Sequence, residues 1–394
     1  MGLQLRSYQK AASDAAVKYF LEEDKRKHKY CGGVLVLPTG TGKSICVADI
    51  AHRLNAPVLI FCPSREILLQ NYDKMEKIEK GISTMYSASV GQKKISMITF
   101  ATIGSAIRHI EEFDVFRYVI IDEAHLTNAE GGMYERFIHR REDRKVVGLT
   151  ATPFRLERDT LKFLTRTRPR IFGKVLYVCQ ITELLSKGYL ADITYYDLTD
   201  LNIDNVRSNS TGSDYDDKSL IAEYERSGFY DKLFSTTMRI LHPKDGTRRN
   251  GILVFTRFIK EAELLKDRLA KEGVKSAIVT GETPKKERES IIEAFKSGEI
   301  EVVTNASCLS IGFDYPELDT VVLAAPTKSL ARYYQQVGRC IRPCKGKRAW
   351  VIDISGSYRR FGKVSDLKIG LEKPNSELWA VFSKGRKLTN TVII

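Results

Sequence analysis

Short runs of wholly apolar, mostly β-branched residues alternate with longer amphipathic stretches in the first half of the chain. A strand of this kind is buried on both faces, as in a parallel sheet that helices cover on both sides. We expect such strands at residues 34–37, 58–61, 96–99, 118–121 and 146–149. Between them, residues 44–54 and 65–77 have the pattern of helices, the second with Ser64 as its N-cap. This alternation predicts an α/β fold with a doubly wound sheet.

The same alternation returns in the second half of the chain. We expect further strands at residues 252–255, 277–279, 301–304, 320–323 and 350–354. Between the halves, residues 199–218 are rich in Asn, Ser and Asp without a periodic apolar pattern, which indicates a mobile connector or a surface insertion. The predicted organisation is a first domain at 1–158, a connector at 159–240, a second α/β domain at 241–358 and a basic tail at 359–394.

The charge of the chain narrows the class of its partner. Its 63 lysines and arginines exceed its 49 acidic residues, which gives a formal net charge of +14. An excess of this size favours a polyanionic partner such as nucleic acid. A merely soluble basic surface would also explain it, so the motifs have to decide.

The cellular setting follows from what the sequence lacks. No stretch approaches the roughly 20 apolar residues of a membrane span, and the first residues contain no apolar signal run. The seven cysteines are scattered without a Cys-x-x-Cys pair, which favours reduced thiols over a metal site or disulfides. We therefore expect a soluble protein of bacterial or phage type with no membrane partner, in the cytoplasm or associated with the nucleoid.

The segment Pro-Thr-Gly-Thr-Gly-Lys-Ser at residues 38–44 lies between a predicted strand and a predicted helix. This arrangement points backbone N–H groups and a helix N-terminus at phosphate oxygens. Lys43 is predicted to contact the β- and γ-phosphates, and the Ser44 hydroxyl to ligate Mg²⁺. Leu37 stands where the motif usually has its first glycine, so a coincidental glycine turn is the alternative. The residues predicted to bind the nucleotide here are Thr39, Gly40, Thr41, Gly42, Lys43 and Ser44.

Two carboxylates directly follow the predicted strand at 118–121. A carboxylate at the carboxyl end of a strand, beside a phosphate loop, is where a nucleotide-hydrolysing site holds Mg²⁺. We expect Asp122 to hold the metal through water and Glu123 to orient or deprotonate the attacking water. His125 is poorly placed to be the base and is expected to hydrogen-bond across a domain cleft. An acidic cap on a following helix is the alternative.

Three blocks together resemble a superfamily 2 helicase of the DEAH-box type. They are the glycine loop, the tetrad Asp-Glu-Ala-His at 122–125, and the segment Gln-Gln-Val-Gly-Arg-Cys-Ile-Arg at 335–342. Residues 149–156 and 184–190 resemble the group that contains RadD, XPB, phage UvsW and the motor subunits of type III restriction enzymes. The likeness is strongest to RadD-type DNA repair helicases, although the cysteine-rich zinc region of those proteins is not in this sequence.

The resemblance implies two tandem RecA-like domains with parallel β-sheets, and ATP and nucleic acid bound at or across the cleft between them. It also implies roles for single residues. Residues 5–9 are similar to the adenine-reading motif, 149–153 to the block that couples hydrolysis to the track, and 335–342 to the arginine-finger motif. The residues concerned are Arg6 and Gln9 for adenine, Thr150, Thr152 and His125 for coupling, Gly312 and Asp314 near the nucleotide, and Gln335, Arg339 and Arg342 as catalytic residues beside Lys43, Asp122 and Glu123.

Short hydroxyl and guanidinium side chains at predicted strand ends are the candidates for contact with a nucleic-acid backbone. Such groups bind phosphates and sugars without reading bases, so we expect binding that is independent of sequence. Each residue alone is more often a helix cap or a turn residue. The candidates are Ser64, Arg65, Thr99, Thr102, Thr256, Arg257 and Thr304.

The predicted function is that of an ATP-dependent DNA helicase or translocase in repair, recombination or replication, with ATP and Mg²⁺ as cofactors. Two alternatives stay open. One is an RNA helicase, because discrimination against DNA depends on contacts to 2′-hydroxyls that a sequence does not reveal. The other is a DNA-stimulated motor subunit that serves a repair, recombination or nuclease partner protein.

Overall fold

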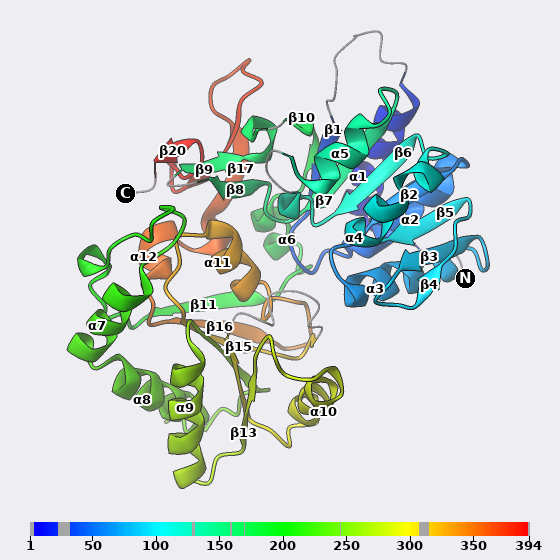
Figure 1. The fold of residues 1–394 in the computed structure, drawn as a ribbon. Helices are drawn as coiled ribbons and strands as arrows, with labels where there is room; N and C mark the ends of the chain where they lie inside the picture. The colour runs from blue at the N-terminus through cyan, green and yellow to red at the C-terminus, as the bar shows by residue number, and fades with distance from the viewer. Residues whose placement is uncertain are drawn as a thin grey trace. The chain divides into compact units, whose positions relative to one another are not determined.

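The structure is a computed structural model that describes residues 4–22, 32–127, 131–157, 160–168, 170–244, 246–306 and 315–392. The chain forms two compact units (Figure 1). Unit 1 consists of Met1–Arg155, Lys162–Gln180 and Ile369–Val381, and unit 2 of Leu156–Leu161, Ile181–Lys368 and Phe382–Ile394. Among the described residues, no helix has both the length and the apolar character that a membrane crossing requires.

Unit 1 is built on a sheet that has eight strands within the described residues, in the order β10-β1-β7-β6-β2-β5-β3-β4. All neighbours pair in parallel except β3 and β4. The strands are β1 (Gly32–Val36), β2 (Val58–Phe61), β3 (Ser83–Ser87), β4 (Gln92–Lys93), β5 (Ile98–Ala101), β6 (Tyr118–Asp122), β7 (Lys145–Thr150) and β10 (Phe172–Val178). The predicted strands of the first half are therefore confirmed. The one at 96–99 begins two residues later, because Ser96 and Thr99 bond to each other in a turn.

Helices cover both faces of this sheet, as the apolar runs predict. The first group is α1 (Ser7–Leu21), α2 (Lys43–Leu54) and α3 (Arg65–Glu76), which contact β1, β2 and β5 respectively. On the other face lie α4 (Ile103–Ala106), the 3-10 segment η1 (Ile107–Phe113) and α5 (Met133–His139). There the rings of Phe61 and Phe137 pack edge to face with centroids 4.9 Å apart. Short 3-10 turns follow at η2 (Ala124–Leu126) and η3 (Leu164–Arg166).

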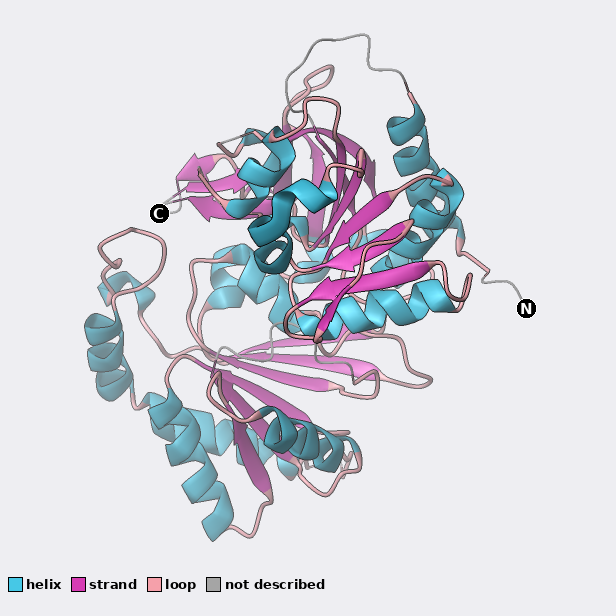
Figure 2. Cartoon of the chain, turned by 45° about the vertical axis from the view of Figure 1, so that its right-hand side comes forward, coloured by secondary structure: helices cyan, strands magenta, loops and turns pink. Residues whose placement is uncertain are grey.

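Unit 2 contains a sheet whose described strands number six, all parallel, in the order β11-β16-β15-β12-β14-β13. They are β11 (Asp192–Asp197), β12 (Ile252–Thr256), β13 (Ser276–Val279), β14 (Val302–Ala306), β15 (Thr320–Ala324) and β16 (Arg348–Asp353). Its helices are α6 (Ile181–Ser186), α7 (Asp217–Ser227), α8 (Phe229–Leu241), α9 (Ile259–Lys271), α10 (Lys285–Lys296), α11 (Leu330–Val337) and α12 (Ser357–Phe361) (Figure 2). All five strands expected in the second half are present. The edge strand β11 was not predicted, because its sequence Asp-Ile-Thr-Tyr-Tyr-Asp is polar and only half-buried.

The segments predicted to be a connector or insertion and a basic tail both contain regular structure. In residues 199–218, the turn η4 (Ile203–Asn205) is capped by Asn202, and Ser208 pairs with Tyr215 in a β-bridge. In residues 359–394, the turn η5 (Val364–Asp366) precedes the strands β17 (Leu367–Leu371), β18 (Trp379–Ser383), β19 (Arg386–Lys387) and β20 (Thr391–Val392). The described strands form small sheets in the orders β17-β18-β19 and β20-β9-β8, with β8 at Phe154–Glu157 and β9 at Thr160–Phe163. Residues 369–381 belong to unit 1, so the C-terminal segment is not a separate tail.

Candidate functional site

The glycine loop connects β1 to α2 at the carboxyl edge of the first sheet. Gly40 and Gly42 have φ angles of 83° and 78°, in the left-handed region that glycine enters without strain. The Thr41 hydroxyl donates a hydrogen bond to the carbonyl of Pro38 at 2.7 Å and closes the turn. Leu37 is fully buried, and its backbone N–H donates to the carbonyl of Thr150 at 2.9 Å. The residue that replaces the usual glycine thus adds one hydrogen bond to β7 just beyond the end of β1, and the loop begins after it.

Side chains from the first turn of α1 hold the glycine loop in place by hydrogen bonds. The side-chain amide of Gln9 donates to the Thr41 carbonyl at 2.7 Å, and the Tyr8 hydroxyl donates to the same oxygen at 2.9 Å. The Arg6 backbone N–H in turn donates to Gln9 Oε1 at 2.8 Å. A Cβ atom on Gly42 would lie 2.8 Å from Gln9 Nε2, so only glycine fits there without a shift. Tyr8 lies within the motif at residues 5–9, but the sequence analysis gave it no role, because only Arg6 and Gln9 match the adenine contacts there.

Three adjacent parallel strands bring the remaining blocks to the same edge. Because β1, β7 and β6 are neighbours, their carboxyl ends meet, and the glycine loop, residues 122–125 and residues 150–152 gather there. Lys43 Nζ lies 3.2 Å from Glu123 Oε1, with both side chains mostly buried. Glu123 has φ 49° and ψ 53°, a left-handed conformation that costs a non-glycine residue about 1 kcal/mol or more. The predicted lysine and the predicted base are thus direct partners.

Asp122 is held by two donors in a buried position. Its Oδ1 accepts the Glu123 backbone N–H at 2.9 Å, and its Oδ2 accepts the Asn71 side-chain amide at 2.9 Å. Burial, and then the charge of Glu123, raise the pKa of Asp122 to about 6, while Lys43 and the two hydrogen bonds oppose the shift. A buried carboxylate whose charge is this unfavourable fits a cation ligand, since a divalent ion would relieve it.

Asn71 is a hydrogen-bond partner of Asp122 that the sequence did not predict. It is fully buried on α3, where it shares the inward face with Leu68 and Met75. Its amide also donates to the Cys62 sulfur at 3.4 Å. An asparagine among apolar residues at spacings of three and four is the signal that could have identified it, because a buried amide needs a polar partner.

His125 connects the acidic block to residues 150–152. Its Nδ1 lies 2.9 Å from the Thr150 hydroxyl and 3.4 Å from Glu123 Oε2. The Thr150 hydroxyl also accepts the Thr152 backbone N–H at 3.0 Å. Burial lowers the pKa of His125, so the ring is neutral at physiological pH. The three residues expected to couple hydrolysis to the track therefore form one contact chain within unit 1.

The candidate nucleic-acid contacts in unit 1 differ in accessibility. Ser64 follows β2 and caps α3 by accepting the Ile67 N–H at 3.3 Å, and Arg65 begins that helix. Thr102 follows the neighbouring strand β5, where its hydroxyl donates to the Ser105 hydroxyl at 2.9 Å. Thr99 is fully buried inside β5 and bonds to Ser96, so its side chain is turned away from solvent. The expectation that Thr99 lies at a strand end fails because β5 extends two residues further.

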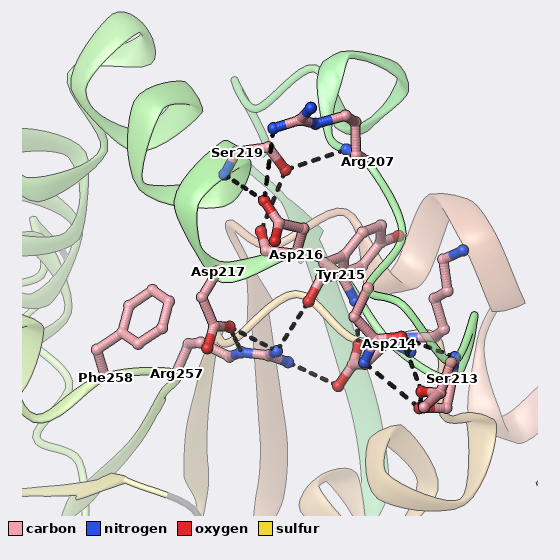
Figure 3. Close-up of polar contacts among 12 residues, drawn as sticks. Arg207, Ser213, Asp214, Tyr215, Asp216, Asp217, Ser219, Arg257 and Phe258 are labelled. Carbon is pink, nitrogen blue, oxygen red and sulfur yellow. Dashed lines mark hydrogen bonds and ion pairs between the residues drawn. The ribbon is translucent and has the colours of Figure 1, made fainter.

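In unit 2, Thr256 and Thr304 lie in adjacent strands with only 1% of their surface exposed. Arg257 follows β12 and is engaged by the segment expected to be a connector. Its guanidinium contacts Asp214 at 2.6 Å, Asp217 at 2.9 Å and the Tyr215 carbonyl at 3.2 Å (Figure 3). The predicted backbone-binding arginine is thus occupied by carboxylates of its own chain.

The arginine-finger segment begins on α11. Gln335 lies in that helix, Arg339 is mostly buried after it, and Arg342 is half-buried. Burial lowers the pKa of Arg342 to about 10, which leaves it positively charged at neutral pH. Gly312 and Asp314 lie outside the described residues.

The comparisons with known proteins agree with these blocks. Residues 2–155 match the family described as type III restriction enzyme, res subunit, and residues 232–344 match the helicase conserved C-terminal domain. The chain is 26% identical to IRC3 of Saccharomyces cerevisiae over 90% of its length and 52% of that protein. It is 27% identical to the DNA 3'-5' translocase XPB2 of Sulfurisphaera tokodaii, over 89% of this chain and 81% of that one. ATP-dependent RNA helicases are also among its relatives, at 25% identity or below.

A solved structure supports the fold. The DNA-bound type ISP restriction-modification enzyme LlaBIII matches with a TM-score of 0.63 and 19% identity, over 90% of this chain and 28% of that one. The prediction of two RecA-like domains is therefore confirmed. The chain spans about half of IRC3 and less than a third of LlaBIII.

Proposed function

We propose that the chain is an ATP-driven motor that moves on DNA. It belongs to superfamily 2 of the helicases, in the group that includes XPB and the restriction-enzyme motors. The observation that carries the proposal is the contact between Lys43 and Glu123 beside the buried Asp122. A lysine, a base and a metal-binding carboxylate at the edge of one parallel sheet are the parts that phosphoryl transfer to water needs. The block at 122–125 is assigned to the DEAH-box type as part of this proposal.

ATP would replace an internal contact on binding. Lys43 would leave Glu123 for the β- and γ-phosphates, and the loop glycines would let backbone N–H groups reach the same oxygens. Glu123, freed from the lysine, would then orient the attacking water and accept its proton. Ser44 and Asp122 would hold Mg²⁺, which neutralises phosphate charge when bound.

The second unit would complete the reaction. Arg339 and Arg342 would contact the γ-phosphate, with Gln335 beside them, and an arginine supplied in this way is worth roughly 10³–10⁵ in rate. His125, through Thr150, would report the state of the nucleotide to residues 150–152. Alternating grip by the two units would then move the protein along a strand.

DNA is preferred over RNA because DNA translocases and helicases are prominent among the relatives, and the pathway would be repair, recombination or replication. An RNA helicase is the second candidate, favoured by the RNA helicases among the same relatives. A motor subunit that serves a nuclease or recombinase is the third, favoured by the likeness to restriction enzymes.

The experiment is ATP hydrolysis by the purified chain with single-stranded DNA, duplex DNA, forked DNA and single-stranded RNA of matched length. We expect at least tenfold stimulation by DNA, lost in the Glu123→Gln variant. Stronger stimulation by RNA would replace the DNA assignment with the RNA one. Stimulation by DNA without displacement of a forked strand would favour translocation for a partner, and no stimulation by any of the four would refute the motor.

A further inference from the structure

Unit 2 contains a cavity of about 570 Å³ at the carboxyl edge of its sheet. Thr199 follows β11, Thr327 follows β15 and Ser355 follows β16, and all three line the cavity. Because these strands are neighbours in the order β11-β16-β15, their carboxyl ends meet here. The rest of the wall comes from residues 201–204 and 215 and from residues within 356–361 and 386–391, so distant parts of the chain build one site.

The charged lining of the cavity is mostly positive. The lining residues that the structure describes include one carboxylate and four cations, a formal excess of three positive charges. The carboxylate is Asp204, and the cations are Arg359, Arg360, Arg386 and Lys387. Like charges gathered in a cavity raise its potential and attract an anion. Arg359 forms an ion pair at 2.7 Å with Asp197, which lies outside the cavity wall, so counting that carboxylate as well leaves an excess of two positive charges.

Neutral oxygens orient two of these cations. Arg360 Nη1 donates to the Tyr215 hydroxyl at 2.5 Å, and Arg386 Nη2 donates to the Arg360 carbonyl. A hydroxyl or carbonyl acceptor fixes a guanidinium group without cancelling its charge. The orientation is therefore set before any ligand arrives.

Hydrogen bonds to Asp353 hold the loop that follows β16, and two serines of this loop line the cavity. The buried carboxylate of Asp353 accepts the Ser355 N–H at 2.8 Å, the Ser355 hydroxyl at 2.7 Å and the Tyr358 N–H at 2.5 Å. The Ser357 hydroxyl lies 2.9 Å from that of Ser355, and both residues line the cavity. Both hydroxyl protons are used inside the loop, because Ser355 donates to Asp353 and Ser357 therefore donates to Ser355. The loop thus fixes the shape of the wall, and the guanidinium groups are the donors for phosphate oxygens.

Tyr215 joins the cavity to the candidate nucleic-acid contact of unit 2. Its hydroxyl receives the hydrogen bond from Arg360, and its carbonyl receives one from Arg257 at 3.2 Å. A strand whose phosphates replaced Asp214 and Asp217 at Arg257 would therefore reach the cavity next. This adjacency favours a polymer over a free small molecule.

We propose that the cavity binds phosphate groups of single-stranded nucleic acid and extends the track of unit 2 beyond Arg257. The inference rests on the proposed function, because it assigns a further part of the same track. The shared chemistry is that of a phosphate oxyanion, so a free polyphosphate is the other source to be tested.

The test uses the full chain with Arg386→Ala and Lys387→Ala combined, since these two wall cations are adjacent in β19. The control combines Lys384→Ala and Lys373→Ala, which removes two exposed charges of the same C-terminal segment outside the cavity. Single-stranded DNA affinity is measured from 50 to 200 mM salt, and unfolding midpoints check that both variants fold.

We expect the cavity variant to lose about 1.4 from the slope of log affinity against log salt, at about 0.7 per phosphate contact. Over that fourfold salt range, the affinity ratio of parent to variant would change about sevenfold. The control variant should keep the parental slope. Equal slopes in all three proteins would overturn the inference and leave the motor function standing.

A second arm separates the two phosphate sources. Inorganic tripolyphosphate is titrated by calorimetry into Lys43→Ala protein, in which the glycine loop is impaired, with and without the two cavity substitutions. Loss of tripolyphosphate binding together with unchanged DNA slopes would overturn the nucleic-acid assignment and identify a free polyphosphate as the ligand. If the parent protein bound no nucleic acid, the proposed function would fail, and with it this extension of the track.

Discussion

Replacing Asp122 by asparagine is expected to stabilise the ligand-free protein while it abolishes ATP hydrolysis. The carboxylate is buried, and its pKa is raised from 3.8 to about 6 because burial and the nearby Glu123 disfavour its charge. An amide has nearly the same shape and carries no charge. It can also use a free acceptor, because within the described residues Asn71 Oδ1 is buried without a hydrogen-bond partner. Rotation of the Asn71 amide would present this oxygen to the new side chain.

The size of the gain follows from linkage. A raised pKa means that the folded state prefers the protonated acid. The contribution of this group to the free energy of unfolding is therefore fully present below pH 3.8 and is lost as the pH rises through 6. The full loss is about 3 kcal/mol, at about 1.4 kcal/mol for each tenfold difference in proton affinity. The Asp122→Asn variant does not undergo this loss. Its free energy of unfolding should therefore exceed that of the parent by about 0.5 kcal/mol at pH 4 and by about 3 kcal/mol at pH 8, with most of the increase below pH 6.

The assay is urea unfolding of both proteins at pH 4, 6 and 8 with a chelator, so that no metal binds the carboxylate. Asp143→Asn is the control, because hydrogen bonding to Arg141 lowers the pKa of this exposed carboxyl and its removal should not stabilise the fold at pH 8. A variant at position 122 that is less stable than the parent at pH 8 would refute the reasoning. A difference that does not change between pH 4 and pH 8 would also refute it.

Three further predictions concern other parts of the molecule. Arg342→Ala should retain ATP binding but lose DNA-stimulated hydrolysis by roughly 10³-fold or more, and full stimulated turnover in this variant would exclude the finger role. Gly148→Ala should cost about 1–3 kcal/mol of unfolding free energy, because a Cβ there would lie 2.6 Å from the Cβ of a buried neighbour, whereas Gly104→Ala, which meets nothing within 4 Å, should not. Asp214→Ala should cost about 1–3 kcal/mol in the same urea assay, because it leaves a mostly buried arginine without its 2.6 Å partner. The more exposed Asp217→Ala should cost less than about 1 kcal/mol, and equal losses would contradict this account.

Residues close together in the sequence made much of the fold predictable. The apolar runs at 34–37, 58–61 and 118–121 became β1, β2 and β6, because a strand buried on both faces has to be apolar along its whole length. Ser64 caps α3 as expected, since the cap and the helix are adjacent. The strand β10 was missed, because it lies at the edge of its sheet and most of its residues are only half-buried.

The candidate site also has parts that the sequence predicted and parts that it did not. The sequence alone determined the glycine loop and the acidic block, because each is a contiguous segment whose chemistry depends on its own residues. Only the tertiary structure decided that Asn71 supports Asp122 and that Asp214 occupies Arg257, contacts between residues 51 and 43 positions apart. It also turned the polar segment at 199–218 into the wall of a basic cavity. Such pairings depend on where whole strands and helices pack. The free energy of that packing comes from residues far apart in the chain, so no short segment of the sequence predicts it.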